Sequence, residues 1–409
     1  MTETLQATAT IKRTRTMKRI DVLVLSTVTG GHAISHFLYQ SFLVMLPAVR
    51  DALAISPLQV GAIMTAREMA SGLTSLPGGL VCDRFRRYWG VVLALCMMGF
   101  GLGWLIVGLS HTYFLLILGM MLTSIAASLW HLPAMAALSQ RFAKRRGTAL
   151  SIHGVGGNVG DVLGPFLTGL LLGYLSWRGV LSVYVAIPLL LAVMVVWAFR
   201  DIHGEEGREA AGLGLRDQLR ETANLLKEAT IWRVNAVSAL HGMCYQVYTT
   251  FLPLYLADEL GFGSKQIGLY IGLLFSVGIV ATPLMGYLSD RVGRKAIVVP
   301  TLLGSCLLSL VLALLGQGSW LLVILILLGI FLRSDFSLLS ATALDIVGHQ
   351  VATTTLGVLS FSRFIMGAIS PLIGGLLYER WGMDAALYYV AGLFGLATIV
   401  FVTTRLRNQ

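Results

Sequence analysis

The chain has 409 residues, of which 56% are hydrophobic and only 12% are charged. A soluble domain carries roughly 25% charged residues, so this composition excludes an ordinary soluble protein and indicates one that crosses a membrane many times. The net charge of +10 is distributed over short polar stretches between long apolar runs, so we expect a lipid bilayer as the partner and no nucleic acid.

The apolar runs, taken in chain order, predict twelve membrane-spanning helices of about 20 residues or more, the length that a bilayer requires. Residues 1–19 are polar and basic and do not resemble a signal peptide. The polar segment 201–229 is expected to link an N-terminal half, 20–200, to a C-terminal half, 230–409. The expected spans are 20–48, 57–82, 88–110, 113–140, 147–175, 178–200, 231–257, 265–289, 296–316, 319–346, 353–378 and 384–404.

The basic residues indicate the orientation in the membrane. They gather in the N-terminal tail, in the turns after the second, fourth and eighth spans, in the central linker and at the C-terminus. The opposite side holds only Arg50, Arg178, Lys265 and Arg380. Positive charge marks the cytoplasmic side, so we expect a multi-pass protein of a bacterial inner membrane with both termini, and the linker, in the cytoplasm.

One short stretch occurs twice, as Gly79-Leu-Val-Cys-Asp-Arg-Phe-Arg-Arg87 and as Gly286-Tyr-Leu-Ser-Asp-Arg-Val-Gly-Arg-Lys295. The second copy follows the first by 207 residues, the separation of Asp290 from Asp83. A duplicated apolar unit is typical of transporters that are built from structural repeats. The candidate residues of these two turns are Gly79, Asp83, Arg84, Arg87, Gly286, Asp290, Arg291, Gly293 and Arg294.

The duplicated stretch resembles the turn between helices 2 and 3 of the major facilitator superfamily, which reads roughly G-x-L-x-D-R-x-G-R-K. The resemblance covers nearly the whole chain. It implies an all-α membrane protein with 12 transmembrane helices in two pseudo-symmetric six-helix halves. It also implies that these turns are cytoplasmic and help to close the halves together. Helices 2 and 11, and helices 5 and 8, are then expected to pack across the interface.

A ladder of small residues occupies the fifth span and the equivalent eleventh span. Small residues four apart let two helices approach closely. The fifth-span pattern resembles the G-x-x-x-G-P-x-x-G-G of superfamily exporters, with ordinary close packing as the alternative interpretation. The ladder residues are Gly156, Gly160, Gly164, Pro165, Gly169, Gly367, Pro371, Gly374 and Gly375.

Three further patterns resemble the fosmidomycin-resistance type of drug exporter. They are Ser35-His-Phe-Leu-Tyr-Gln-Ser41 in the first span, Trp130-His-Leu-Pro133 in the fourth and Gly156-Gly-Asn-Val-Gly160 in the fifth. The resemblance implies proton-coupled efflux of a small molecule.

Ionisable side chains within the spans are functional candidates, because each costs about 2.5–3.5 kcal/mol at the bilayer centre. Glu68, Asp161 and Asp335 are the candidates for proton coupling. Asp161 is the first choice because it has no basic neighbour in the sequence, with a structural hydrogen bond as its alternative role. Arg363 in the eleventh span could pair with Glu68 or its neighbour, either as a structural pair or as a contact that breaks during transport.

Aromatic, polar and basic residues of several spans are expected to line a central cavity. Buried arginines favour an anionic substrate, whereas arginines neutralised by carboxylates would favour lipophilic drugs. His32 and His36 share a helix face, but that helix offers no third ligand and the four cysteines have no metal-ligand spacing, so we expect no metal. The cavity candidates are His32, His36, Tyr39, Gln40, Trp130, His131, His241, Tyr245, Gln246, Arg333, Arg67 and Arg363.

The sequence therefore predicts a secondary transporter, expected as a monomer, that exports a small amphiphilic or anionic molecule in exchange for protons. No phosphate-binding loop and no catalytic set occur, so we expect neither an enzyme nor a cofactor, with the proton gradient as the energy source. A lipid or lysophospholipid flippase, ion-coupled uptake of an organic anion and a non-transporting membrane sensor remain as alternatives.

Overall fold

The computed structural model describes residues 19–85, 88–200, 228–318, 320–347 and 352–406. The predicted tail 1–19 and linker 201–229 therefore lie almost entirely outside the described residues. Among the described residues all regular secondary structure is helical, which agrees with the predicted all-α class. The long helices are α2 (Arg19–Leu53), α3 (Pro57–Arg84), α4 (Trp89–Leu109), α5 (Tyr113–Arg141), α6 (Arg146–Leu171), α7 (Trp177–Phe199), α9 (Ala229–Asp258), α10 (Ser264–Val292), α11 (Arg294–Leu315), α12 (Trp320–Val347), α13 (Ala352–Trp381) and α14 (Met383–Thr403).

These twelve long helices correspond one to one to the twelve predicted spans, with ends that shift by a few residues. The fifth helix ends at Leu171 rather than at residue 175, because the chain turns there. Local sequence defines several other ends. The Thr112 hydroxyl accepts the backbone N–H of Leu115 at the start of α5, and Ser176 does the same for Gly179 at the start of α7, as N-cap residues do.

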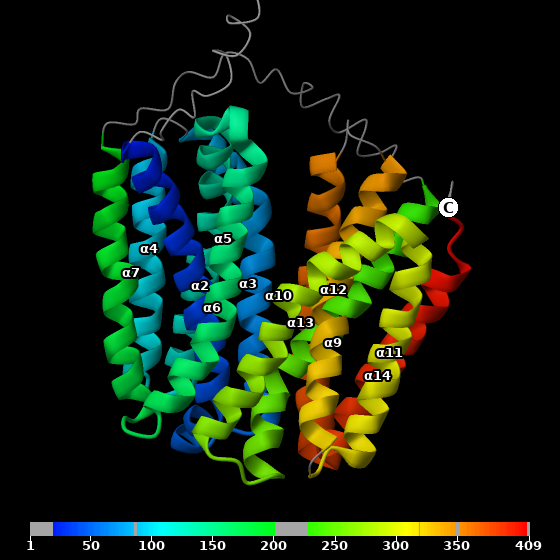
Figure 1. The fold of residues 1–409 in the computed structure, drawn as a ribbon. Helices are drawn as coiled ribbons and strands as arrows, with labels where there is room; N and C mark the ends of the chain where they lie inside the picture. The colour runs from blue at the N-terminus through cyan, green and yellow to red at the C-terminus, as the bar shows by residue number, and fades with distance from the viewer. Residues whose placement is uncertain (1–18, 86–87, 201–227, 319, 348–351, 407–409) are drawn as a thin grey trace, which may run out of the picture.

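The helices form two bundles, α2 to α7 and α9 to α14 (Figure 1). Within the first bundle α2 packs on α6 and α4 packs on both α5 and α7. Within the second, α9 packs on α13, α10 on α12 and α11 on α14. Between the bundles α3 packs on α13 and α6 on α10. These last two contacts are the pairings that the family resemblance implied for helices 2 with 11 and 5 with 8.

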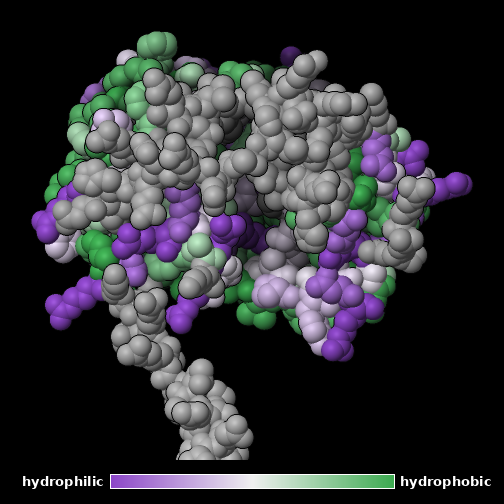
Figure 2. Space-filling view, turned by 90° about the horizontal axis from the view of Figure 1, so that it is seen from above, coloured by the Kyte–Doolittle hydropathy of each residue, from purple (hydrophilic) through white to green (hydrophobic). Residues whose placement is uncertain are grey.

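The two ends of the molecule differ in how the bundles meet. We call the end where α2 begins the proximal end and the opposite end the distal end. The ribbons of the bundles approach each other toward the distal end and separate toward the proximal end (Figure 1). The proximal face carries clusters of hydrophilic residues, with hydrophobic residues around its edge (Figure 2). Such an edge suits contact with lipid, and such a face suits contact with water.

Candidate functional site

An ion pair between Asp161 and Arg333 joins the two bundles in the middle of the molecule. Asp161 lies on α6 and is 1% exposed. Its Oδ2 accepts a hydrogen bond from Nη2 of Arg333 on α12, 2.8 Å away. Its Oδ1 accepts hydrogen bonds from Nδ1 of His36 at 2.8 Å and from Nε2 of Gln40 at 3.0 Å, both on α2. Asp161 is therefore fully paired, and one of its partners belongs to the other half.

The small residues of the ladder explain how these groups reach one another. Gly156, Gly160 and Gly164 lie directly against the backbone of α2, where a methyl group would overlap backbone atoms of Thr29 or Phe37. The close approach of α2 and α6 places the side chains of α2 beside Asp161. Replacing one of these glycines with a larger residue would push α2 and α6 apart, because helix backbone cannot move aside as a flexible side chain can.

A glycine on α10 gives Arg333 its position in the same way. A methyl group at Gly278 would meet Cβ and Cγ of Arg333 at 2.6 and 2.7 Å. The stem of the arginine therefore crosses the α10 backbone at this point. Nη2 of Arg333 also donates to Oδ1 of Asn158 at 3.4 Å, a residue that the sequence analysis did not select.

The choice of Asp161 rests on its neighbours along the chain, whereas its contacts in the structure come from other helices. Asp161 has no basic neighbour in the sequence, yet two basic side chains, His36 and Arg333, contact it in space. They lie 125 and 172 residues away along the chain. Only the packing of α6 against α2 and α10, and of α10 against α12, brings these charges together, so no local pattern could have predicted the pair.

A second group of polar side chains consists of Arg67, Glu68 and Tyr39. Arg67 and Glu68 form an ion pair on α3, and the guanidinium of Arg67 lies 3.6 Å from the centre of the Tyr39 ring. Glu68 is 3% exposed, and the positive charge of Arg67 offsets its negative charge. Arg363, expected as a possible partner, lies with its guanidinium 5.6 Å from the Tyr245 ring.

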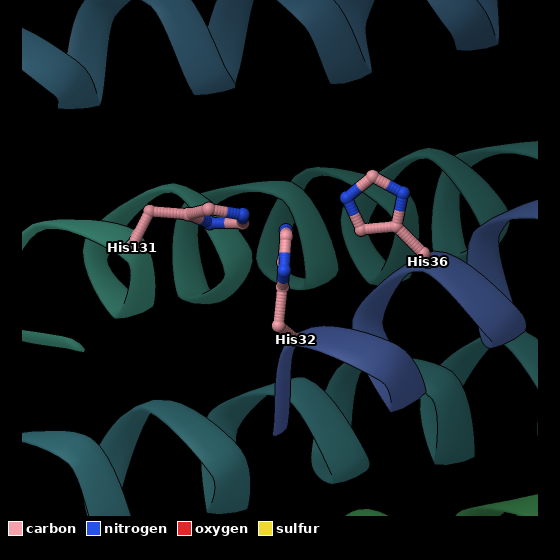
Figure 3. A group of neighbouring side chains, drawn as sticks. All are labelled: His32, His36 and His131. Atoms are coloured by element: carbon pink, nitrogen blue, oxygen red, sulfur yellow. The ribbon is translucent and has the colours of Figure 1, made fainter. Parts of the chain in front are cut away.

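Four histidines gather on the side of the first bundle, next to Asp161. One ring nitrogen each of His32, His36 and His131 lie within 4.8 Å of one another, and the three rings point toward a common space (Figure 3). His153 stacks on His32 with ring centres 4.2 Å apart. The expectation that His32 and His36 lack a third ligand considered α2 alone and was incomplete, since the third imidazole comes from α5.

The second bundle contains a buried acid, Asp335, which is 0% exposed. Neither of its carboxylate oxygens has a hydrogen-bond partner. The nearest cationic candidate is Nε2 of His241, 4.0 Å from Oδ2, but this nitrogen donates to the backbone carbonyl of Leu332 at 3.0 Å. The hydroxyl of Thr301 on α11 likewise bonds to carbonyls of its own helix. Asp335 thus differs from Asp161, whose oxygens are paired.

Two further predicted cavity residues, Trp130 and Gln246, are buried against neighbouring helices. Trp130 is fully buried in the core of the first bundle, where a methyl group at Gly31 would overlap its ring. It packs α2 against α5 in this structure and lines no central space. Gln246 is 9% exposed, and its Cγ would lie 3.6 Å from a methyl group at Gly367.

The turn motif of the second bundle is fully described. Arg294 forms ion pairs with Asp290 at 2.5 Å and with Asp345 at 2.7 Å, all within the second bundle. Gly293 has a φ of +99°, a conformation that favours glycine and explains its place in the motif. The first copy is described only in part. Arg87 lies outside the described residues, and the surroundings of Gly79, Asp83 and Arg84 are not described.

The distal end holds contacts between the bundles that the sequence analysis missed. Arg50 at the end of α2 forms a two-pronged ion pair with Asp258 at the end of α9, one contact of which, from Nη2 to Oδ1, is 2.7 Å. The hydroxyl of Tyr378 also donates to Asp258, at 3.1 Å. The carboxylate of Glu379 on α13 accepts the backbone N–H of Leu58 on α3 at 3.0 Å.

Three small-residue contacts reinforce the distal end. Gly169 and Gly268 face each other where α6 crosses α10, Gly61 of α3 faces the backbone at Pro371, and Gly375 of α13 faces the backbone of α3. Gly374, in contrast, faces Val247 and Phe251 of its own bundle. The eleventh-span ladder therefore serves two seams, one between the bundles and one inside the second bundle.

Comparison with known proteins agrees with this architecture. The sequence profile described as Major Facilitator Superfamily matches residues 28–371 and 237–409. The chain is 23% identical to the fosmidomycin resistance protein of Escherichia coli (strain K12), over 99% of both chains. It is 24% identical to the probable sulfoacetate transporter SauU of Cupriavidus necator, over 85% of both.

A solved structure shares the fold. It is the inward-facing, unoccupied form of a bacterial homolog to the human lysosomal transporter Spinster, with a TM-score of 0.84 at 16% identity, covering 96% of this chain and 100% of that one. Two bundles of six helices, matched halves and a profile that spans most of the chain lead to one conclusion. The protein belongs to the Major Facilitator Superfamily and is a membrane transporter.

Proposed function

We propose that this transporter is a proton-coupled antiporter that exports small organic anions or anionic amphiphiles. We place it as a monomer in a bacterial inner membrane, with the proximal end in the cytoplasm and the distal end outside. The observation that carries the proposal is the ion pair of Asp161 with Arg333 between the halves, because a substrate acid can replace Asp161 as the partner of Arg333.

Alternating access follows from where the halves are joined. Arg50 with Asp258, and Leu58 with Glu379, close the distal end, whereas the ion pairs of Arg141 with Asp21 and of Arg294 with Asp345 stay within one half. A substrate that enters from the proximal end meets Arg333 at the interface. Binding there removes the Asp161 contact between the halves, which lets them reorient around the site.

Anion binding is supported by the chemistry of the interface. Arg67 on α3 and Arg363 on α13 belong to helices that pack against each other between the halves. The side chain of Arg333 reaches Asp161 of the other half and is 22% exposed. A guanidinium binds carboxylate, phosphonate or sulfonate through two parallel hydrogen bonds. The aromatic rings of Tyr39 and Tyr245 lie under two of these guanidinium groups and offer apolar area to an amphiphilic substrate. A relative named as a probable sulfoacetate transporter supports the same chemical class, because sulfoacetate is an organic anion.

We assign the proton site to Asp335 rather than to Asp161 or Glu68. Asp161 and Glu68 each have a guanidinium partner, which stabilises the charged form. Asp335 has neither a guanidinium nor a hydrogen bond, and an isolated buried charge is costly. Protonation removes that cost, so a proton can load and unload at this residue as its surroundings change during the transport cycle.

The test uses purified protein in liposomes with an imposed pH gradient and a pH-sensitive dye inside. Wild-type protein should move protons when an anionic substrate is added, and should prefer anionic over cationic dyes. Asp335→Asn should retain substrate exchange and lose proton movement. Asp384→Asn, the same change at an exposed position of α14, is the matched control and should behave as wild type. Exchange without proton movement in wild type would refute the coupling, and preference for cations would refute the substrate class.

The charge count gives a second candidate, which is uptake. Three arginines, Arg67, Arg333 and Arg363, and three acids, Glu68, Asp161 and Asp335, lie within the spans near the centre. A proton on Asp335 leaves one positive charge in excess, which favours simultaneous binding of an anion and therefore co-transport. The same assay decides, because protons move against the substrate in antiport and with it in co-transport.

A further inference from the structure

The histidine cluster of the first bundle has the features of a metal site. We propose that His32, His36 and His131 bind one divalent transition-metal ion of the zinc, cobalt or nickel class, through the Nε2 atom of each ring. Imidazole nitrogen is a preferred ligand of these ions. The proposal is independent of proton coupling and of the substrate's identity.

The first argument is the state of each ring. Nδ1 of His32 bonds to the backbone carbonyl of His153 at 2.8 Å, and Nδ1 of His131 bonds to the carbonyl of Ala127 at 2.7 Å. A carbonyl oxygen only accepts, so both Nδ1 atoms carry the proton. Nδ1 of His36 faces the Asp161 carboxylate at 2.8 Å, which also accepts. In all three neutral rings the lone pair is therefore on Nε2.

This arrangement matches what metal-binding histidines require. A metal-ligating histidine almost always donates its other ring N–H to a carbonyl or a carboxylate, which fixes the ring and raises its basicity. Here two carbonyls and one carboxylate take these positions before any metal is bound. Any buried imidazole needs an acceptor for its N–H, and in these three rings the bonded atom is Nδ1 each time, which leaves every Nε2 available to an ion.

The second argument is distance and direction. The three rings come from two helices and point toward one space (Figure 3), with ligand nitrogens within 4.8 Å of one another. A tetrahedral ion with metal–nitrogen bonds of about 2.0–2.1 Å needs nitrogens about 3.4 Å apart. Small rotations of the side chains close the difference. Three protein ligands also leave a fourth position open, as in sites where the ion exchanges or binds another molecule.

The third argument is His153, which stacks on His32. It is 4% exposed, so burial holds the ring against His32. A ring held in this way limits the orientations open to His32, whose Nδ1–H donates to the carbonyl of His153.

A bound ion would act on the contact between the halves through His36. Metal on Nε2 makes the Nδ1–H of His36 a stronger donor to Asp161, and so fixes the carboxylate in the orientation that contacts Arg333. We therefore expect the ion to slow substrate exchange.

The test titrates Co²⁺ into protein that was purified with a tag free of histidine and stripped with EDTA. Wild type should bind one Co²⁺ per chain and develop the visible absorption bands of a cobalt–imidazole site, and Zn²⁺ should displace it. His32→Ala, His36→Ala and His131→Ala should each weaken binding at least 10-fold. His111→Ala, at an exposed histidine of the turn between α4 and α5, is the matched control and should bind as wild type.

The wild-type spectrum alone can overturn the site, so the test does not depend on whether a variant folds. Absence of the cobalt bands in protein concentrated enough for weak d–d absorption to be detected, with Co²⁺ in excess, would refute it. Equal affinity in the variant that combines His32→Ala, His36→Ala and His131→Ala would refute it as well. His131→Gln keeps a polar group at its position and should also lose binding. Substrate exchange measured with Zn²⁺ and with EDTA tests the link to Asp161. Equal rates at saturating Zn²⁺ would refute that link and leave the binding result standing.

Discussion

The ion pair of Arg50 with Asp258 gives the most direct prediction about conformation. It joins α2 of one half to α9 of the other at the distal end, and its side chains are 17% and 29% exposed. Asp258→Asn removes the charge that Arg50 contacts with two nitrogens. We expect the state with the distal end closed to become less favourable and the opposite state to gain population.

The size of the effect follows from the environment of the pair. Hydrogen bonds to charged groups contribute about 1.5–3 kcal/mol, and exposure to solvent reduces such contributions toward about 1 kcal/mol. A loss of about 1–2 kcal/mol changes the ratio of the two states by about 5–30-fold. Tyr378 loses a charged acceptor as well, which places the expected shift in the upper part of that range.

The measurement is the distance between spin labels at His111, in the distal turn between α4 and α5, and at Trp320, the first residue of α12 at the distal end of the other half. Asp258→Asn should broaden the distance distribution toward longer values. Asp51→Asn is the matched control, because Asp51 also contacts Arg50, at 2.7 Å, but belongs to the same half and is 67% exposed. An unchanged distribution in Asp258→Asn, or an equal shift in Asp51→Asn, would refute the role of this pair.

Three further predictions concern contacts between helices. Gly160→Leu should prevent close packing of α2 on α6 and abolish folded protein in size-exclusion chromatography, whereas Gly154→Leu, where nothing lies within 4 Å, should fold normally. A double-mutant cycle of Asp161→Asn and Arg333→Gln, read from thermal unfolding, should give a coupling of about 0.5–3 kcal/mol, and strict additivity would exclude a direct pair. Gly169→Leu should disfavour the closed distal end, since the side chain would overlap α10, and unchanged label distances would contradict this.

The fold could be predicted from the sequence because its signals are local. Each span is a run of apolar residues that is long enough to cross a bilayer, and the repeated turn at Asp83 and Asp290 fixes the duplication. The helix pairings were implied by resemblance alone. The end of the fifth span was predicted at residue 175 but lies at Leu171, because the end of an apolar run does not define where the hydrogen-bonded turns stop.

The candidate site was only partly predictable. Asp161, Arg333 and the histidines could be selected because polar residues in apolar runs are conspicuous. Their partners could not, because each contact joins helices that are far apart in sequence. His131 lies 99 residues after His32, and nothing near either residue indicates that α5 brings the two rings together.

The facing glycines Gly169 and Gly268 have a mechanical consequence. Their backbones meet without intervening side chains near the distal end of α6, so this crossing can serve as a pivot. Most of α6 extends from the pivot toward the proximal end. From Gly169 back to Arg146 the helix runs for about 35 Å at 1.5 Å per residue, and a tilt of about 10° would swing that far end by about 6 Å. A hinge built from two glycines could thus convert a small angular change into an opening wide enough for a small organic ion.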